Sequence, residues 1–489
     1  MCNMSPPITP LDPRVCDQAR RSRDPRFDGL FFTAVTSTRI YCRPMCPAPT
    51  PKPQNIQYFH SAAAAEAAGF RPCLRCRPEL SPGSAQWRRA DDHVARALRA
   101  INEGALHNGG LEAVSARLGI GTRQLRRLFA QTFGTSPIAV ATTQRLLFAK
   151  QLISETRMPM TEIAMASGFG SLRRFNAAFQ TAYRMPPSRL RATEPTQSDD
   201  VLRLRLSYRP PFDFGSTLAF LRQRAIPGIE TIDDRCYRRD LLLSKGPAWF
   251  EVCQLAGAHA LQVTAHNVTA LDLADAVRRI RRLFDLDADP ASVESVLRED
   301  ALFRGRNGFT AGLRIPGGYD GFEVAVRAVL GQQISVAATT TFARRLVTKF
   351  GQSSIAEHGS RVPRFPSPAE LFDANLESIG IIRSRAHALR SMARAVAEGR
   401  VHFQAEQTLD AFVASWTALP GIGDWTAQYI AMRALGHPDA FPAGDLILRR
   451  QAAPNTSPLT EKSLRTRAEG WRPWRAYAVI QLWSRASKL

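Results

Sequence analysis

Four cysteines near the start of the chain have the types and spacing of a metal site. Cys42 and Cys46 form one close pair, and Cys73 and Cys76 form a second pair in the same basic segment. Four thiolates in a reducing compartment suit zinc, because zinc accepts sulfur ligands in a tetrahedral arrangement. The alternative is four unrelated buried cysteines, which the pairing disfavours. The sequence therefore predicts one zinc ion bound by all four sulfurs.

Arginines crowd these cysteine pairs, although a closed structural zinc site does not need them. Arg43 follows Cys42 directly, and Arg71 lies shortly before Cys73. Guanidinium groups pair well with phosphate oxygens. We therefore expect Arg43 and Arg71 to contact DNA phosphates and to hold a thiolate close to a phosphate substituent. Because four thiolates give the centre a net negative charge, its sulfurs should stay nucleophilic at neutral pH.

A second chemical motif lies near the end of the chain, at Leu419-Pro420-Gly421-Ile422-Gly423. It separates two helical segments, and its glycines permit a turn tight enough for backbone N–H groups to meet a phosphate at the next helix N-terminus. This device is a helix-hairpin-helix, often completed by a monovalent cation. The alternative is an ordinary turn between two helices.

Asp445 follows a loop that contains Pro442 and Gly444. It is either a helix N-cap or a catalytic carboxylate, and the preceding hairpin favours catalysis. Trp425 and Tyr429 are four residues apart and so share a helix face. On spacing alone, such aromatic residues indicate a hydrophobic core.

Charge and length limit the class of protein. The 489 residues include 65 Lys and Arg against 43 Asp and Glu, a net charge of +22, and only six of the basic residues are lysine. This excess predicts a polyanionic partner, most simply DNA. The length suggests about three to four domains. We find no signal peptide and no membrane span, so we expect a cytoplasmic protein without a membrane partner.

The pattern divides into four blocks: 1–80, 85–193, 200–315 and 316–489. Polar linkers are expected at 78–84 and 193–200. Alternating residues predict strands at 202–208 and 261–265, and a helix is expected behind Asp272 as N-cap. The second and fourth blocks have helical spacing. The fold class is therefore multidomain and mainly α with α+β.

The second block contains two helix-turn-helix patterns, 111–129 and 163–176. Each has a glycine in the turn and a second helix rich in arginine or amide side chains. The alternative is a plain pair of helices with solvated arginines. The candidates for base or phosphate contact are Arg123, Gln124, Arg127, Arg173, Arg174 and Asn176.

Segments 28–32, 40–46 and 68–76 resemble the N-terminal domain of Ada adaptive-response proteins. The resemblance implies that Cys42 accepts a methyl group from a DNA methylphosphotriester, once per molecule, while Cys46, Cys73 and Cys76 complete the zinc site. Loss of one negative charge then strengthens DNA binding. The tandem helix-turn-helix block resembles the AraC/XylS regulator domain, which follows the zinc domain in Ada.

Segments 419–429, 445–448 and 471–477 resemble AlkA-type DNA-3-methyladenine glycosylase II, whose mixed α/β first domain is similar to 200–315. The resemblance implies a pocket for a flipped base lined by Trp425, Tyr429 and Trp483. Electron-rich rings suit a base that carries positive charge. Asp445 would stabilise an oxocarbenium-like sugar or activate water. Gln332 and Gln333 lie where this family inserts a wedge into the duplex.

Residues that the related enzymes carry and this sequence lacks narrow the expected activity and cofactors. Trp425 stands where glycosylases that also cut the strand have a lysine, so we expect a monofunctional enzyme. No cysteine follows Cys253, so an iron–sulfur cluster is not expected. A Pro-Cys-His-Arg run is absent, and with it the usual last domain of Ada. We expect Cys236 and Cys253 to be ordinary buried thiols, and Cys2 and Cys16 to be exposed or loosely structured.

Together these patterns predict an alkylation-response protein. A zinc methyl acceptor and a regulator domain precede a glycosylase for 3-methyladenine-type purines. The partner is double-stranded DNA, alkylated or operator, and RNA polymerase is a candidate partner of a nucleoid-associated monomer. The rival is a methylation-responsive activator whose C-terminal half only binds DNA. A bifunctional glycosylase for oxidised bases is opposed by Trp425.

Overall fold

The computed structural model describes residues 11–83, 93–102, 104–106, 110–191, 201–243, 246–305, 308–351, 353–355, 361–404, 407–453 and 457–486. The chain divides into two compact units. The first comprises Met1–Pro210, Leu255–Thr264 and Thr269–Arg278; the second comprises Pro211–Gln254, Ala265–Val268 and Arg279–Leu489. The predicted linker 193–200 and Cys2 lie outside the described residues.

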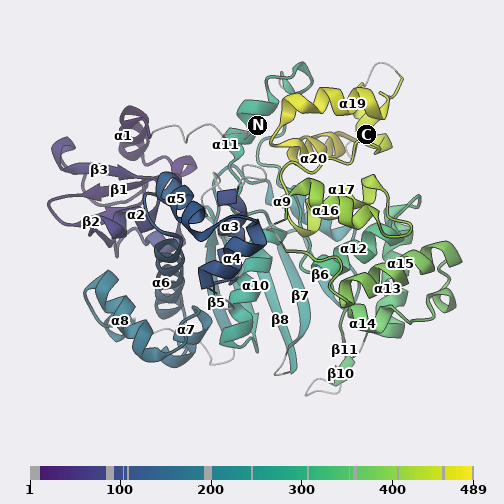
Figure 1. Cartoon of the computed structure of the whole chain (residues 1–489), viewed down its shortest axis with the longest axis horizontal. Helices are drawn as coiled ribbons and strands as arrows, with labels where there is room; N and C mark the ends of the chain where they lie inside the picture. Colours follow the sequence, from purple (N-terminus) through teal and green to yellow (C-terminus); the bar gives the residue numbers. More distant parts are fainter. Residues whose placement is uncertain are drawn as a thin grey trace. The chain divides into compact units, whose positions relative to one another are not determined.

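A small four-stranded sheet organises the cysteine segment of the first unit (Figure 1). Strands β2 and β4 run parallel, with Ile40 opposite Arg71 and Tyr41 opposite Pro72. Cys42 and Cys73 therefore stand at the same end of neighbouring strands. The strand order is β3-β1-β2-β4, and the elements are α1 (Pro13–Ser22), η1 (Pro25–Phe27), β1 (Phe32–Val35), β2 (Ile40–Cys42), η2 (Pro53–Asn55), β3 (Ile56–Phe59), α2 (Ala62–Ala67), β4 (Arg71–Pro72) and η3 (Pro78–Leu80).

Cys16 does not lie where we expected it. It sits on α1 and is only 3% exposed, packed in a small cluster with Ala19 and Phe31. The expectation of an exposed or loosely structured thiol is wrong, because α1 is amphipathic and Cys16 lies on its apolar face.

The block that follows is helical, as predicted. In each helix-turn-helix the turn contains a glycine in the left-handed region, Gly119 at φ 69° and Gly168 at φ 79°. A side chain at this φ would be strained, which explains glycine at both turns. The elements are α3 (His93–Asn102), α4 (Gly110–Leu118), α5 (Thr122–Phe133), α6 (Pro137–Glu155), α7 (Met160–Ala166), α8 (Leu172–Tyr183) and η5 (Pro187–Leu190).

The α+β block contains both predicted strands, β5 (Val201–Ser207) and β9 (Ala260–His266). The predicted helix is α10 (Ala270–Leu283), but its start differs: the Thr269 hydroxyl accepts a hydrogen bond from the Asp272 backbone N–H at 3.2 Å. Asp272 therefore lies inside the first turn. The other elements are α9 (Phe214–Arg222), β6 (Glu230–Ile232), β7 (Cys236–Leu243) and β8 (Gly246–Gln254), with β7 antiparallel to both β6 and β8.

The C-terminal block is helical with one core, and the structure adds a short antiparallel pair, β10 (Ser353–Ile355) and β11 (Arg361–Pro363). No helix among the described residues is long and apolar enough to cross a membrane. The helices α11 (Pro290–Leu297) and η6 (Ala301–Phe303) end the α+β block. The helices of the C-terminal block are α12 (Gly321–Leu330), α13 (Val336–Phe350), α14 (Pro368–Leu371), η7 (Leu376–Ile379), α15 (Arg383–Ala397), α16 (Leu409–Thr417), α17 (Asp424–Ala434), α18 (Leu446–Gln451), α19 (Glu461–Ala468), η8 (Glu469–Trp471) and α20 (Arg475–Ala486).

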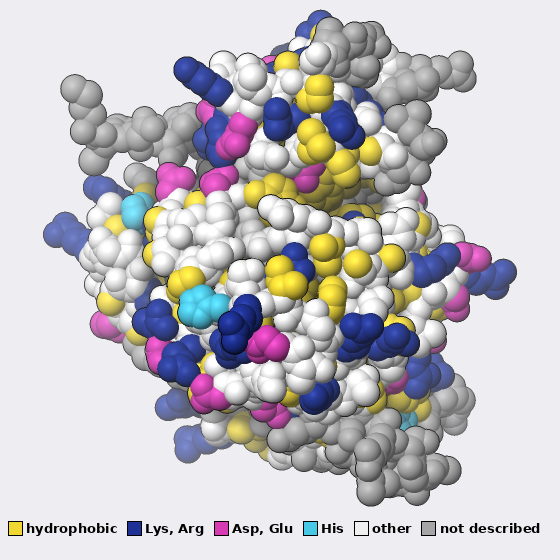
Figure 2. Space-filling view, turned by 90° about the vertical axis from the view of Figure 1, so that its right-hand side faces the viewer, with side chains coloured by type: hydrophobic (Ala, Val, Ile, Leu, Met, Phe, Trp, Pro, Cys, Tyr) yellow, Lys and Arg dark blue, Asp and Glu magenta, His cyan; other side chains and the backbone are white. Residues whose placement is uncertain are grey.

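Figure 2 faces the side of the second unit that carries α13 and α15. Hydrophobic side chains line a recess across the upper part of this face, and Lys and Arg side chains are spread around it. Among the residues of this unit that the structure describes, the exposed large hydrophobic ones are Val336, Ile382, Leu446 and Ile447. Apolar side chains amid positive charge suit a surface that meets both the bases and the phosphates of DNA.

A buried four-charge cluster joins strands β6 and β7 to α12 inside the second unit. Arg239 pairs with Glu230 and Glu323, and Arg327 pairs with the same two carboxylates. Burial alone would raise the pKa of Glu230, but the two guanidinium groups lower it to about 2. The two positive and two negative charges cancel, which is the condition for burying charges at all.

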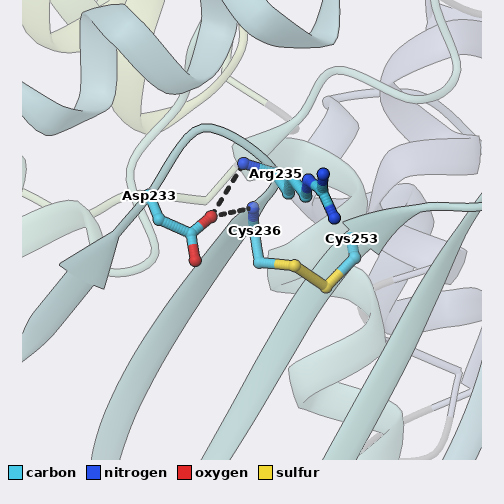
Figure 3. The surroundings of a disulfide bond; sticks show 4 residues. All are labelled: Asp233, Arg235, Cys236 and Cys253. Atoms are coloured by element: carbon cyan, nitrogen blue, oxygen red, sulfur yellow. Dashed lines mark hydrogen bonds between the residues drawn. A yellow bond between two sulfur atoms is a disulfide. The ribbon is translucent and has the colours of Figure 1, made fainter.

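Cys236 and Cys253 form a disulfide, so the expectation of two ordinary buried thiols is wrong (Figure 3). The residues lie directly opposite each other on β7 and β8, with Cα atoms 4.4 Å apart. That separation is within disulfide reach. Asp233 accepts hydrogen bonds from the backbone N–H groups of Arg235 and Cys236, both at 2.7 Å. The sequence could not predict the pair, because it depends on the strand register.

Candidate functional site

Three aromatic side chains and one carboxylate come together between α17 and α20. The rings of Trp425 and Tyr429 stack with centroids 5.2 Å apart, and Trp483 lies 6.1 Å from Tyr429. Trp425 Nε1 donates to Asp445 Oδ2 at 3.1 Å, and Trp483 Nε1 donates to Oδ1 at 3.4 Å. The structure thus assembles all four residues that the sequence predicted for this site. All four are half-buried.

Asp445 is also the N-cap of α18. Its Oδ1 accepts a hydrogen bond from the Leu448 backbone N–H at 3.0 Å. The two alternatives for Asp445, helix N-cap and catalytic carboxylate, are therefore compatible. Capping fixes the carboxylate at the end of the loop, and the two indole N–H groups orient it. A carboxylate held in this way can face a positive charge without reorganising.

The hairpin before α17 uses its two glycines differently. Gly421 has φ 76°, and a Cβ on it would lie 2.7 Å from the Ala388 Cβ of α15. Gly423 has an ordinary φ, and a Cβ on it would meet no other atom within 4 Å. Gly421 is therefore required by the fold, whereas Gly423 leaves the N-terminus of α17 accessible. Exposed N–H groups at such an end suit a phosphate.

The two glutamines after α12 also differ. Gln332 Nε2 donates to the Gly421 carbonyl at 2.9 Å and to the Thr426 hydroxyl at 3.0 Å. Gln333 is exposed, with φ 58° in the left-handed region. Gln332 thus supports the hairpin, and Gln333 is the one that projects. Ile382, the N-cap residue of α15, is 60% exposed. Arg385 in the first turn of α15 donates a hydrogen bond to the Gln332 carbonyl at 2.6 Å.

Sequence reasoning missed three residues beside Tyr429. Arg433 Nη1 donates to the Tyr429 hydroxyl at 2.8 Å, and its guanidinium lies 4.9 Å from the Phe220 ring centroid. The Arg224 guanidinium stacks on the same ring, 3.7 Å from its centroid. Burial alone would raise the pKa of Tyr429, but the charges of Arg433 and Arg224 lower it.

These omissions have different causes. Arg433 is four residues after Tyr429 on one helix, so spacing could have found it. Arg224 and Phe220 come from α9 and the turn after it, far away in the sequence, and no local signal links them to the aromatic pocket.

The four predicted zinc ligands lie together, with all sulfurs within 4.8 Å of one another. Tetrahedral zinc–sulfur bonds of about 2.3 Å require closely spaced sulfurs of this kind. Cys42 and Cys46 are half-buried, whereas Cys73 and Cys76 are buried. The Arg43 backbone N–H donates to Cys76 Sγ at 3.4 Å. The first pair is thus the more accessible one, and Cys76 carries a hydrogen bond that weakens a nucleophile.

Arg43 does not lie on the surface as we expected. It is 8% exposed, makes a bidentate ion pair with both carboxylate oxygens of Asp28 and donates to the Cys76 carbonyl at 3.1 Å. Its guanidinium is thus occupied inside the domain, because Asp28 offers a buried counter-charge. Arg71 is half-buried and stays a candidate for phosphate contact.

The predicted contact residues of the helix-turn-helix block share one arrangement. Leu125, Phe129 and Phe133 on α5 are buried, and Phe175 and Phe179 occupy matching positions on α8. The opposite face of each helix is exposed and carries the candidates. These are Arg123, Gln124 and Arg127 on α5, and Arg173, Arg174 and Asn176 on α8.

Four domain families match the sequence in order. They are the metal binding domain of Ada at 15–79, a helix-turn-helix domain at 114–193, the AlkA N-terminal domain at 203–320, and HhH-GPD superfamily base excision DNA repair proteins at 326–476. Their order and nature confirm the predicted fold class.

Relatives cover both halves. The chain is 39% identical to a probable bifunctional transcriptional activator/DNA repair enzyme AlkA of Mycobacterium tuberculosis, over 96% of this chain and 95% of that protein. It is 32% identical to DNA-3-methyladenine glycosylase 2 of Escherichia coli, over 57% of this chain and 95% of the relative. Identity to the Escherichia coli bifunctional activator/repair enzyme Ada is 38%, over 25% of this chain and 33% of that protein.

Proposed function

This chain belongs to the family of AlkA-type bifunctional transcriptional activator/DNA repair enzymes, and from that premise we propose how its residues act. The C-terminal half is a DNA-3-methyladenine glycosylase that takes an alkylated purine out of the duplex and hydrolyses its N-glycosidic bond. The observation that carries this assignment is Asp445, held by Trp425 and Trp483 in an aromatic pocket beside the hairpin.

The flipped base stacks among Trp425, Tyr429 and Trp483. Alkylation at N3 or N7 gives the purine a positive charge, so it is a good leaving group and needs no strong general acid. As the bond to the base breaks, positive charge grows on the sugar. Asp445 stabilises that charge or activates the attacking water. With Trp425 in place of a lysine, no Schiff base forms and the enzyme is monofunctional.

Around the pocket, the hairpin and the loop after α12 bind the duplex. The open N-terminus of α17 at Gly423 receives a phosphate, and a monovalent cation completes the contact. Gln333 enters the gap left by the base, where its amide hydrogen-bonds the orphaned partner base. Ile382 supplies the apolar contact that a glutamine lacks.

The N-terminal domain accepts a methyl group from a DNA methylphosphotriester. Zinc, when bound by the four cysteines, keeps their sulfurs deprotonated. The Cys42 sulfur attacks the methyl carbon; an S–C bond forms, the C–O bond breaks, and its electron pair leaves with the phosphodiester oxygen. Cys42 and Cys46 are half-buried, while Cys76 is buried and hydrogen-bonded, which favours the first pair as the source of the acceptor. Within that pair, the resemblance to Ada favours its first cysteine, Cys42.

The helix-turn-helix block then reads an operator through the exposed faces of α5 and α8, and Arg71 adds a phosphate contact. If the protein activates transcription, RNA polymerase is its partner, and we propose that the protein acts as a monomer. Since the substrate is chromosomal DNA, we place this protein in the bacterial cytoplasm, at the nucleoid.

The decisive experiment measures bases released from methylated duplex DNA by the full-length protein and by Asp445→Asn. We expect release by the parent protein and a fall of about 10²–10³ in single-turnover rate for the variant, with DNA affinity kept. Asp410→Asn, an exposed acidic residue at the start of α16, is the matched control. If the protein binds this DNA and releases no base, the result supports the alternative function, a methylation-responsive activator whose C-terminal half only binds DNA.

A further inference from the structure

Helix α6 connects the two helix-turn-helix motifs and contacts the metal binding domain of residues 15–79, here called the acceptor domain. Both lie within the first unit. Thr143 on α6 donates a hydrogen bond to Glu66 Oε2 at 2.6 Å, and Tyr41 donates to Oε1 of the same carboxylate at 2.8 Å. Tyr41 is fully buried, and Thr143 is only 5% exposed. Since Tyr41 directly precedes Cys42 on β2, Glu66 joins the strand of the predicted methyl acceptor to α6.

A second link to α6 starts beside the last predicted zinc ligand. Arg77 directly follows Cys76 and has φ 54°, in the left-handed region that residues with a side chain rarely adopt. Its guanidinium pairs with Glu79 at 3.0 Å and with Glu155, the last residue of α6, at 2.9 Å. Lys150 of α6 pairs with Glu79 at 2.7 Å, and both side chains of this pair are buried. The first and the last cysteine of the cluster are therefore each followed or preceded by a residue that is tied to α6.

These contacts have the character of a fixed interface. Buried charge pairs and hydrogen bonds set the register of two surfaces, because a displaced partner leaves an unpaired polar group. Domains of one chain that lack such contacts move relative to one another by default. Thr143 lies in the first half of α6 and Glu155 at its end, so the acceptor domain is held at two separated points. Two separated points prevent it from pivoting on the helix.

Resting on the proposed function, we propose that this interface is what allows the charge at the cysteine cluster to act as a switch. With zinc bound by four thiolates, the cluster is negative and is repelled by DNA phosphates. A freely tethered domain would move away from the phosphates and avoid that repulsion. A domain held on α6 stays beside the DNA whenever α5 and α8 bind it. Methylation of Cys42 then lowers a repulsion that the protein has no other way to relieve.

The direction of the effect differs between the two forms of the protein. Before methylation, the interface keeps a negative cluster beside the phosphates and so weakens operator binding. After methylation, it holds phosphate contacts such as Arg71 in place without a further cost of ordering the domain. Loosening the interface should therefore tighten operator binding before methylation and weaken it afterwards. Partial unfolding would weaken both forms and cannot produce this pair of opposite shifts.

The test uses the full-length protein and the double variant Thr143→Val with Glu155→Gln, which changes only α6. The probe is a duplex selected from a random pool by the Cys42-methylated parent protein. Its affinity is measured at low salt before and after exposure to methylphosphotriester DNA. Mass analysis confirms one methyl group per chain, and metal analysis confirms that zinc is kept. We expect methylation to tighten binding about fivefold or more in the parent protein and about twofold or less in the double variant.

Two controls match the two substitutions. Thr142→Val changes the neighbouring half-buried threonine of α6. Glu162→Gln on α7 removes one negative charge from an exposed position of the same block, as Glu155→Gln does from the interface. Each control should keep the methylation gain of the parent protein. Thr143→Val alone, which preserves the size of the side chain, repeats the test with a smaller shift in the same two directions.

Two outcomes overturn the inference and leave the charge switch intact. One is a methylation gain in the double variant equal to that of the parent protein. The other is a fall in the affinity of both forms, in Thr143→Val as well as in the double variant, which would make the contacts supports of the fold alone. A parent protein whose affinity does not change on methylation refutes the charge switch of the proposed function itself, and this inference falls with it.

Discussion

The indole Nε1 of Trp425 donates a hydrogen bond of 3.1 Å to Oδ2 of Asp445. Trp425 therefore has two roles: its ring stacks on Tyr429, and its N–H group fixes the orientation of the Asp445 carboxylate. Substitutions at position 425 can separate these two roles, because phenylalanine keeps a ring and loses the donor, whereas alanine loses both.

We expect Trp425→Phe to slow single-turnover base release by about tenfold, since a hydrogen bond to a charged group is lost while Trp483 still holds the carboxylate. Trp425→Ala should lose a further ~1–3 kcal/mol in base binding through lost stacking. Trp249→Phe on β8 is the control. Equal rates for Trp425→Phe and the parent protein would show that the indole donor does not aim Asp445.

The two hairpin glycines should separate stability from DNA binding. Gly421→Ala forces a side chain into the left-handed region and against Ala388, so we expect it to lower the free energy of unfolding by about 1–3 kcal/mol. Gly423→Ala meets no atom within the domain; it should unfold like the parent protein but bind duplex DNA more weakly. Urea titration and DNA binding at one fixed salt concentration measure the two effects. If both variants behave alike, the division of roles is refuted.

The cysteine cluster should hold one zinc per chain. Metal analysis of the purified protein should give one equivalent, and Cys73→Ser combined with Cys76→Ser should abolish it, because two of four sulfur ligands are lost. Cys16→Ser is the control, since this buried thiol lies on α1 apart from the four ligands. Zinc fully retained in the double variant would contradict the assignment.

Methylation of Cys42 should tighten operator binding, because it removes one negative charge from a domain that faces phosphates. The gain should be largest at low salt and shrink at moderate salt, as ions screen the charge difference. Operator affinity is measured before and after exposure to methylphosphotriester DNA, with Cys42→Ser as the unreactive control. Equal affinity of both forms at low salt would count against the switch.

Asp300 should make the second unit sensitive to acid. Hydrogen bonds from Arg467, the Leu302 backbone and Trp471 lower the pKa of Asp300 to about 2, against 3.8 when free. Its contribution to stability is thus present above pH 3.8 and is lost as the pH falls from there through about 2. We expect Asp300→Asn to flatten this loss, worth on the order of 1 kcal/mol after solvent screening.

Urea unfolding followed by tryptophan fluorescence, at several values of pH, measures this effect, because Trp471 itself contacts Asp300. Asp373→Asn, whose side chain is 70% exposed in its pair with Arg394, should change nothing. The same acid dependence in Asp300→Asn as in the parent protein would disprove the prediction.

The sequence predicts what local spacing encodes. The cysteine pairs, the hairpin, Asp445 and the aromatic residues could be found from it because each motif is contiguous or has a fixed interval. The sequence did not predict the Arg43–Asp28 pair, the Cys236–Cys253 disulfide or the place of Arg224 near Tyr429, since each depends on which strands and helices become neighbours. Gln332 and Gln333 look equivalent in the sequence, and only the backbone conformation separates the supporting residue from the projecting one. The catalytic, base-contact and DNA-contact roles stay predictions.

The cluster of Glu230, Arg239, Glu323 and Arg327 limits how this protein can be divided or recombined. Two of its salt bridges, Arg239–Glu323 and Arg327–Glu230, form only when the strands and α12 are present together. A glycosylase fragment that began at 316 would keep Glu323 paired with Arg327 but would lose the salt bridges of both residues to Arg239 and Glu230. In a chimaera with a relative, the α+β segment and the helices that follow it must therefore be exchanged as one piece. The two segments therefore form one structural unit, although the sequence pattern divides them into two blocks, 200–315 and 316–489.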